Sequence, residues 1–152
     1  MKKQVPYTFH KWSIYIREWV YNNIQNIPEK LDKIKTSIPH ILICKGVDKK
    51  RTRKTLRDSF KIKGIPFGAY CLTGGIPEDT CVLCRFGLFF WRCYYVEKGK
   101  KWDKRVFFTQ NQACFYLYYS ILINFEKSVD LTKTEQEKIK KFKYAAKGIM
   151  KT

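Results

Sequence analysis

Two cysteines separated by two residues, Cys81 and Cys84, are the clearest chemical motif in the sequence. A C-x-x-C spacing lets two thiolates bind one zinc ion, which supplies half of a tetrahedral structural site. Two pairs of residues are available as the remaining ligands, Cys71 with Cys93, or His40 with Cys44. We therefore consider structural zinc as the one cofactor, with Cys81 and Cys84 as its first ligands.

The same motif has a second interpretation. Val82 and Leu83 are apolar, so Cys81 and Cys84 are also compatible with two buried thiols at the start of a strand. The N-terminus has basic residues but no apolar segment behind them, as a secretory signal would require, so we expect an intracellular protein with reduced cysteines. No thioredoxin-like sequence surrounds the C-x-x-C, so we do not predict a redox role for that pair.

A run of cations precedes the cysteines. Lys49, Arg53 and Arg57 are spaced i, i+4, i+8, so a helix would place them in one row over about 12 Å. Three more cations flank the row: Lys50, Arg51 and Lys54. Such a row can follow a phosphate backbone and gain affinity from counterion release. The alternatives are a solvated helix face or a nuclear-localisation stretch.

Two other basic segments follow. Lys100, Lys101 and Lys104 lie at an expected turn and could contact a second run of phosphates. The C-terminal segment is a basic amphipathic helix, which suits docking on the protein's own core, an anionic membrane or a partner helix.

The total charge has the same sign as these segments. The 152 residues include 31 Lys and Arg and 13 Asp and Glu, a net charge of +18. The charge is uneven: residues 41–65 have 9 basic and 2 acidic side chains, whereas the aromatic block 66–97 has 2 basic and 3 acidic ones. A neutral aromatic core with basic faces indicates an anionic partner, of which nucleic acid is the most common.

Catalytic motifs are lacking in the sequence. It contains two histidines, no G-x-x-x-x-G-K-[ST] loop for nucleotide phosphates and no G-x-S-x-G. We therefore expect a protein that is not an enzyme.

The elements that must position these residues follow from hydrophobic spacing. The N-terminal part predicts helices over about 9–27 and 28–39, a strand at 40–44, and a third helix from Asp48 to about Phe60. In that third helix the inner stripe is Thr52, Leu56 and Phe60, with Asp48 as the cap. The basic row would then face outward.

The second half predicts strands and then two helices. Glycines and prolines break residues 64–108 into strands, with an extended aromatic segment at 86–96 and a hairpin turn at 98–101. Residues 109–112 match a capping box, which predicts a buried helix through about Phe125. A last helix over about 134–150 places Ile139 and Phe142 on its apolar stripe, continued by Ala146 and Ile149.

Together these elements predict a single α+β domain over 1–152, with helices flanking a small antiparallel, aromatic-rich sheet. Its parts are a basic helical segment 1–63, a strand and turn segment 64–108 and C-terminal helices 109–152. The longest apolar runs are too short to span a bilayer.

The order of Lys54-Thr55-Leu56, the C-x-x-C at 81–84 and the aromatic run after it resembles the small basic nucleoprotein-type accessory proteins of parvoviruses. Pro6-Tyr7-Thr8 is similar too. The resemblance covers at best residues 47–95, and the Arg/Ser-rich N-terminus of that group is missing. It implies a nuclear viral protein that supports genome replication and RNA processing.

The expected function is binding of DNA or RNA through phosphate contacts by a viral or mobile-element accessory protein in the nucleus or cytoplasm of a host cell. The alternative is a non-enzymatic interaction factor, such as a viral host antagonist, that binds an acidic host protein through its aromatic surface.

Overall fold

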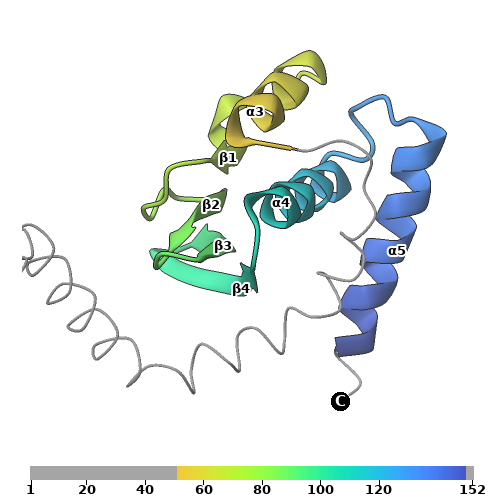
Figure 1. Cartoon of the computed structure of the whole chain (residues 1–152). Coiled ribbons are helices and arrows are strands. Elements are labelled where there is room, and N and C mark those ends of the chain that lie inside the picture. The colour runs from red at the N-terminus through yellow and green to blue at the C-terminus, as the bar shows by residue number, and fades with distance from the viewer. Residues whose placement is uncertain (1–50, 150–152) are drawn as a thin grey trace, which may run out of the picture. The chain divides into compact units, whose positions relative to one another are not determined.

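The computed structural model describes residues 51–149, with side chains through residue 144, and all of them fall in one compact unit. Helices pack against a four-stranded sheet, which confirms the α+β class (Figure 1). The predicted elements before residue 51, together with His40, Cys44, Lys49 and Lys50, lie outside the described residues.

The first described helix, α3 (Arg53–Ile62), begins later than the sequence predicted. Thr52 is its N-cap, because the Thr55 amide donates to the Thr52 hydroxyl (3.3 Å) and the Thr52 amide donates to the Thr55 hydroxyl (2.8 Å). The predicted start at Asp48 is therefore wrong, because Thr52 has an extended backbone and caps the helix, and of the predicted row Lys49, Arg53 and Arg57 only the last two lie in α3. The predicted inner residues Leu56 and Phe60 are confirmed as buried.

The sheet has the order β1-β2-β3-β4, formed by Tyr70–Cys71, Thr80–Phe86, Phe90–Glu97 and Lys100–Phe107. A short 3-10 helix, η1 (Phe67–Ala69), precedes β1. The predicted antiparallel sheet is wrong at one edge, because β1 runs parallel to β2 while the other two pairings are antiparallel. The connection 72–79 makes this possible by returning the chain through Gly74 and Gly75, whose positive φ angles of 99° and 103° suit glycine.

One hairpin turn was not predicted and the other is shorter than predicted. The extended segment predicted at 86–96 is interrupted at 87–89, where Phe86 pairs with Phe90. The second turn is only Lys98 and Gly99, with φ of 51° and 69°, as a two-residue hairpin turn with two positive φ angles requires. Both turn amides donate to the Glu78 carboxylate, Gly99 at 3.1 Å. Lys100 and Lys101 consequently lie in β4 and not in the turn.

Two helices follow the sheet. In α4 (Gln110–Asn124) the capping box between Thr109 and Gln112 is confirmed, and the helix is buried around most of its circumference. α5 (Lys133–Ile149) buries Ile139 and Phe142 against the same core. No helix between residues 51 and 149 is long and apolar enough to cross a membrane.

The two faces of the sheet have different coverings. Leu83 and Cys93 belong to the main core with α3, α4 and α5. On the other face Val82, Tyr94 and Val96 form a smaller cluster that Cys71 and Cys84 adjoin. The connection 72–79 lies against this second face, because the Tyr94 hydroxyl donates to the Gly75 carbonyl at 2.7 Å.

Candidate nucleic-acid interface

The exposed side of α3 carries a row of cations on a helix whose inner face is buried. Leu56 and Phe60 fix its inner face, and the Phe60 ring lies 4.6 Å from that of Tyr70 and 5.7 Å from that of Tyr118, measured between centroids. Four cations lie on its exposed side: Arg53, Lys54, Arg57 and Lys61. Packing of the inner face therefore leaves these four side chains on the outer side of the helix.

Arg51 is not part of this surface. Its guanidinium lies 3.9 Å above the Tyr118 ring centroid and 5.0 Å from that of Phe115, and it donates to the Ser59 hydroxyl at 3.2 Å. Its backbone amide donates to the Asn111 side chain at 2.5 Å. These contacts make Arg51 a packing residue between α3 and α4, whereas its charge alone had placed it among the phosphate contacts.

Arg53 is divided between the two roles. It is exposed, but its guanidinium donates to the Leu72 carbonyl at 3.2 Å and lies 5.5 Å from the Trp91 ring centroid. It therefore connects the start of α3 to the sheet, and removing it would disturb the fold as well as the surface charge.

Lys54, Arg57 and Lys61 have no ion-pair partner within residues 51–144. Their spacing of three and four residues puts them on one side of α3, together with Asp58. Lys61 was not among the residues predicted from the sequence, although its position four after Arg57 extends the same stripe. We name Lys54, Arg57 and Lys61 the α3 cation triad.

The second predicted group, Lys100, Lys101 and Lys104, lies in β4. Lys100 and Lys104 are exposed, while the Lys101 ammonium lies 4.7 Å from the Tyr94 ring centroid on the second face of the sheet. Lys100 pairs with Glu97, six residues along β3 from Trp91, which amounts to roughly 20 Å of strand. Since Arg53 contacts Trp91, the Lys100 end of β4 lies far from the start of α3, whereas Lys104 lies nearer, because its neighbour Arg105 pairs with Cys93.

The four proposed zinc ligands are also not brought together. Cys81 and Cys84 lie three positions apart in β2, and because side chains alternate along a strand they point to opposite faces. Cys81 and Cys93 adjoin or belong to the main core, whereas Cys71 and Cys84 adjoin the second cluster. Among the described residues there is no group of three or more His, Cys, Asp or Glu side chains placed to hold a metal ion.

The thiols differ in acidity because their surroundings differ. Burial, with the neighbouring Asp103 carboxylate, raises the pKa of Cys81 to about 11. Burial raises the pKa of Cys114 to about 12 against the opposing effect of two arginines. At Cys71 burial also acts to raise the pKa, but hydrogen bonds from Thr73 and Gly74 outweigh it and hold the pKa of this thiol below its usual value.

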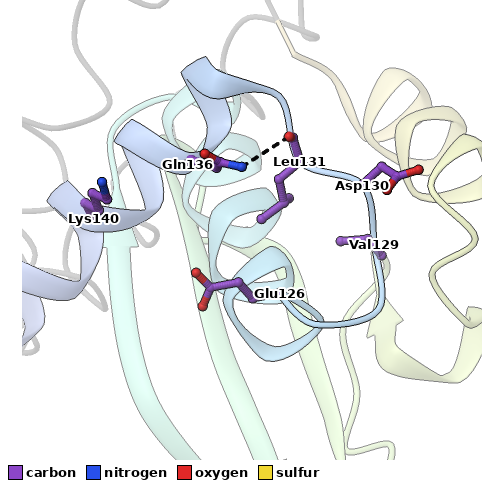
Figure 2. A pocket seen from close by; sticks show the side chains of 6 residues that line it. All are labelled: Glu126, Val129, Asp130, Leu131, Gln136 and Lys140. Atoms are coloured by element: carbon purple, nitrogen blue, oxygen red, sulfur yellow. Dashed lines mark hydrogen bonds between the residues drawn. The ribbon is translucent and has the colours of Figure 1, made fainter.

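An open hollow of about 410 Å³ lies between the loop after α4 and the first turns of α5 (Figure 2). Its lining mixes carboxylates, an amide and an ammonium group: Glu126, Val129, Asp130, Leu131, Gln136 and Lys140. The Gln136 amide donates to the Leu131 carbonyl at 3.5 Å, and Glu126 forms an ion pair with Lys143 at 2.5 Å. The Gln136 amide and the Glu126 carboxylate are thus already bonded to neighbouring groups.

Comparison of the chain with protein-family models, curated proteins and solved structures gives no match. The resemblance to parvoviral accessory proteins therefore stays a prediction from short motifs.

Proposed function

We propose that the protein binds nucleic acid through phosphate contacts made by the exposed side of α3. The observation that carries the proposal is the α3 cation triad: three cations on one side of a packed helix, with no ion-pair partner in the described part of the chain. The packed helix holds the backbone of these three residues in place before a partner binds. The positive end of the helix dipole adds to the positive potential near Lys54.

The wider electrostatics support an anionic partner. Residues 51–149 contain 20 Lys and Arg and 9 Asp and Glu, a net charge of +11. Within the described side chains, ion pairs join Lys63 to Glu135, Arg105 to Asp103 and Lys143 to Glu126. Most of the excess positive charge is thus available to an external polyanion, and long-range attraction would accelerate encounter with it.

The test replaces the triad together, as Lys54→Gln, Arg57→Gln and Lys61→Gln, and measures binding to a generic duplex at several salt concentrations. If all three side chains contact phosphates, the slope of log K against log salt falls by about 2.7, which is roughly 500-fold in affinity at 0.1 M salt. Arg53 is left in place because it connects α3 to the sheet.

The matched control is Lys133→Gln, Lys140→Gln and Lys141→Gln, three exposed positions on α5 that remove the same net charge. We expect this variant to retain most of the slope of log K against log salt that the unmodified protein shows. Equal losses in the two variants would show that bulk charge and not the α3 surface drives binding. No measurable binding by the unmodified protein at low salt would overturn the proposal itself.

A second candidate function is binding of an acidic protein partner. Two apolar side chains near the end of α3 favour it, because Ile62 is 86% exposed and Phe67 is 76% exposed, close in sequence to Lys61. Replacing Ile62 and Phe67 with Ser would weaken the binding of such a partner and leave the salt-dependent binding of a duplex unchanged.

The same proposal covers the broader role. A phosphate-binding protein of this kind fits a viral or mobile-element accessory factor, acting in the nucleus or cytoplasm without catalysing a reaction. Structural zinc bound by Cys81 and Cys84 with a second pair of ligands stays a separate hypothesis. Metal analysis of the purified protein tests that hypothesis, and a stoichiometry near zero would exclude it.

A further inference from the structure

Cys71 and Cys84 lie on the same face of the sheet, away from the helices. Cys71 pairs with Val82 across the parallel β1–β2 ladder, and Cys84 follows Val82 by two residues, so the two cysteines are diagonal neighbours on one surface. Both are partly exposed and both adjoin the second cluster. The pair therefore differs from Cys81 and Cys93, which adjoin or belong to the main core.

Both thiols lie against the same residue. The Cys71 sulfur donates to the Gly74 carbonyl at 3.2 Å. On its other side Gly74 adjoins Cys84: a Cβ atom added to Gly74 would lie 3.1 Å from the Cys84 Cβ and 3.9 Å from its sulfur. Glycine at position 74 is thus required both by its φ of 99° and by its close approach to Cys84. One glycine is the spacer between the two sulfurs.

The surroundings of Cys71 favour a reactive thiolate. Its sulfur lies 3.5 Å from the Thr73 hydroxyl, and the amides of Thr73 and Gly74 stabilise the negative charge. On the other side of the pair, burial and the nearby Cys84 raise the pKa of the Tyr94 hydroxyl to about 12, so Tyr94 stays protonated beside the sulfurs. A partly exposed thiol with a lowered pKa, on the same face of a sheet as a second thiol, is the arrangement expected of a peroxide-sensitive cysteine.

We propose that Cys71 and Cys84 form a peroxide-sensitive thiol pair, in which Cys71 is oxidised first and Cys84 resolves it as an intramolecular disulfide. In the first step the Cys71 thiolate attacks one oxygen of hydrogen peroxide, the O–O bond breaks, and protonation of the leaving hydroxide gives Cys71 sulfenic acid and water. In the second step the Cys84 thiol attacks the sulfenic sulfur, the S–O bond breaks, and a disulfide and a second water form. The two thiols together lose two electrons to the peroxide.

The disulfide would connect β1 covalently to β2 at the parallel edge of the sheet. Residues 72–83 between the two cysteines would become a closed loop. Diagonal neighbours lie about 7–8 Å apart and a disulfide spans Cα distances of up to about 7 Å, so the short strand β1 must move slightly toward β2, with Gly74 and Gly75 absorbing the change in backbone angles. This inference is independent of the phosphate-binding proposal, because no cation of α3 takes part in it.

The experiment treats the reduced full-length chain with hydrogen peroxide, alkylates the remaining thiols and maps the disulfides by mass spectrometry. Trypsin cleaves after Lys63 and Arg85, so Cys71, Cys81 and Cys84 fall in one peptide. Further cleavage before Asp79 separates Cys71 from the other two unless a disulfide joins the pieces. We expect the two pieces to remain joined until a reductant is added.

Two variants identify the partner and the order of oxidation. Cys81→Ser should keep the cross-link, whereas Cys84→Ser should lose it and accumulate a sulfenic acid at Cys71 that dimedone labels. The proposal is overturned if Cys81→Ser loses the cross-link, if Cys71 pairs with Cys44 or another cysteine, if dimedone labels a residue other than Cys71, or if peroxide leaves all cysteines reduced.

Discussion

Glu135 is the point at which three helices are connected, and its replacement by Gln gives the sharpest prediction about stability. One carboxylate oxygen accepts from the Tyr118 hydroxyl at 2.5 Å, and the other accepts from the Lys63 ammonium at 3.0 Å and the Thr132 amide at 2.9 Å. The Glu135 and Lys63 side chains are only 12% and 15% exposed, so water replaces little of what is lost. Gln is neutral and has one acceptor oxygen, so if that oxygen faces Lys63 and Thr132, its amide faces the Tyr118 hydroxyl, which must turn from donor to acceptor.

The magnitude follows from the number and type of these bonds. A hydrogen bond to a charged group contributes about 1.5–3 kcal/mol when its partners are shielded from water. Glu135→Gln weakens all three bonds, because none of them any longer involves a carboxylate. Partial exposure reduces the sum, so we expect a loss of about 2 kcal/mol in the free energy of unfolding, or about 1 M in the urea midpoint.

The effect depends on pH in a defined direction. Burial acts to raise the pKa of Glu135, but hydrogen bonds from Tyr118, Thr132 and Lys63 outweigh it and hold the pKa below the usual range of a glutamate. A carboxylate with a depressed folded pKa stabilises the protein above its unfolded pKa and loses that contribution as pH falls through the folded one. The difference between Glu135→Gln and the original chain should therefore be full at pH 7 and shrink on acidification below the unfolded pKa.

The matched control is Glu137→Gln, which removes the same charge from an exposed position two residues along α5. We expect it to change the free energy of unfolding by less than about 0.5 kcal/mol. Urea unfolding followed by intrinsic fluorescence measures both variants. Equal effects of the two substitutions at pH 7, or an effect of Glu135→Gln that grows as the pH is lowered, would refute the reasoning.

Two further predictions concern the packing and the start of α4. Arg51→Lys keeps the charge but loses the stacking of the guanidinium on Tyr118, so the free energy of unfolding should fall by about 1 kcal/mol while the affinity for a duplex stays unchanged. A large loss of affinity without loss of stability would instead make Arg51 a phosphate contact. Thr109→Ala removes the hydroxyl that accepts from the Gln112 amide at 3.2 Å, so it should lower the free energy of unfolding, measured in urea, by about 1 kcal/mol. The control Thr134→Ala, at an exposed position of α5, should lower it by less.

The sequence predicted best the elements whose signals are local. The Thr109 to Gln112 capping box and the apolar residues after it defined α4 almost to the residue, because cap chemistry and burial agree there. The start of α3 was missed because its cap uses Thr55 where Glu or Gln is the usual partner. The parallel pairing of β1 had no local signal, since a strand of two residues has no periodicity to detect.

The candidate sites were harder to predict for related reasons. Charge alone cannot distinguish Lys54, which faces solvent, from Arg51, which stacks on Tyr118. The C-x-x-C spacing fits a metal when the chain bends between the cysteines, but β2 is extended through Cys81 and Cys84 and separates them onto two faces. The pairing of Cys71 with Cys84 on one face became visible only from the position of Gly74 and the parallel β1–β2 ladder, which are tertiary features.

The outer edge of β4 affects how the chain behaves toward other copies of itself. No described strand pairs with it, and a free edge is a template for adding strands from other copies of a protein. Here the pairing register shifts between Cys93 and Tyr95, Asp103 adopts a φ of 44°, and Lys100 and Lys104 are exposed. An irregular edge with exposed lysines resists intermolecular sheet growth, so the lysines of β4 protect the chain from aggregation even if no phosphate contacts them.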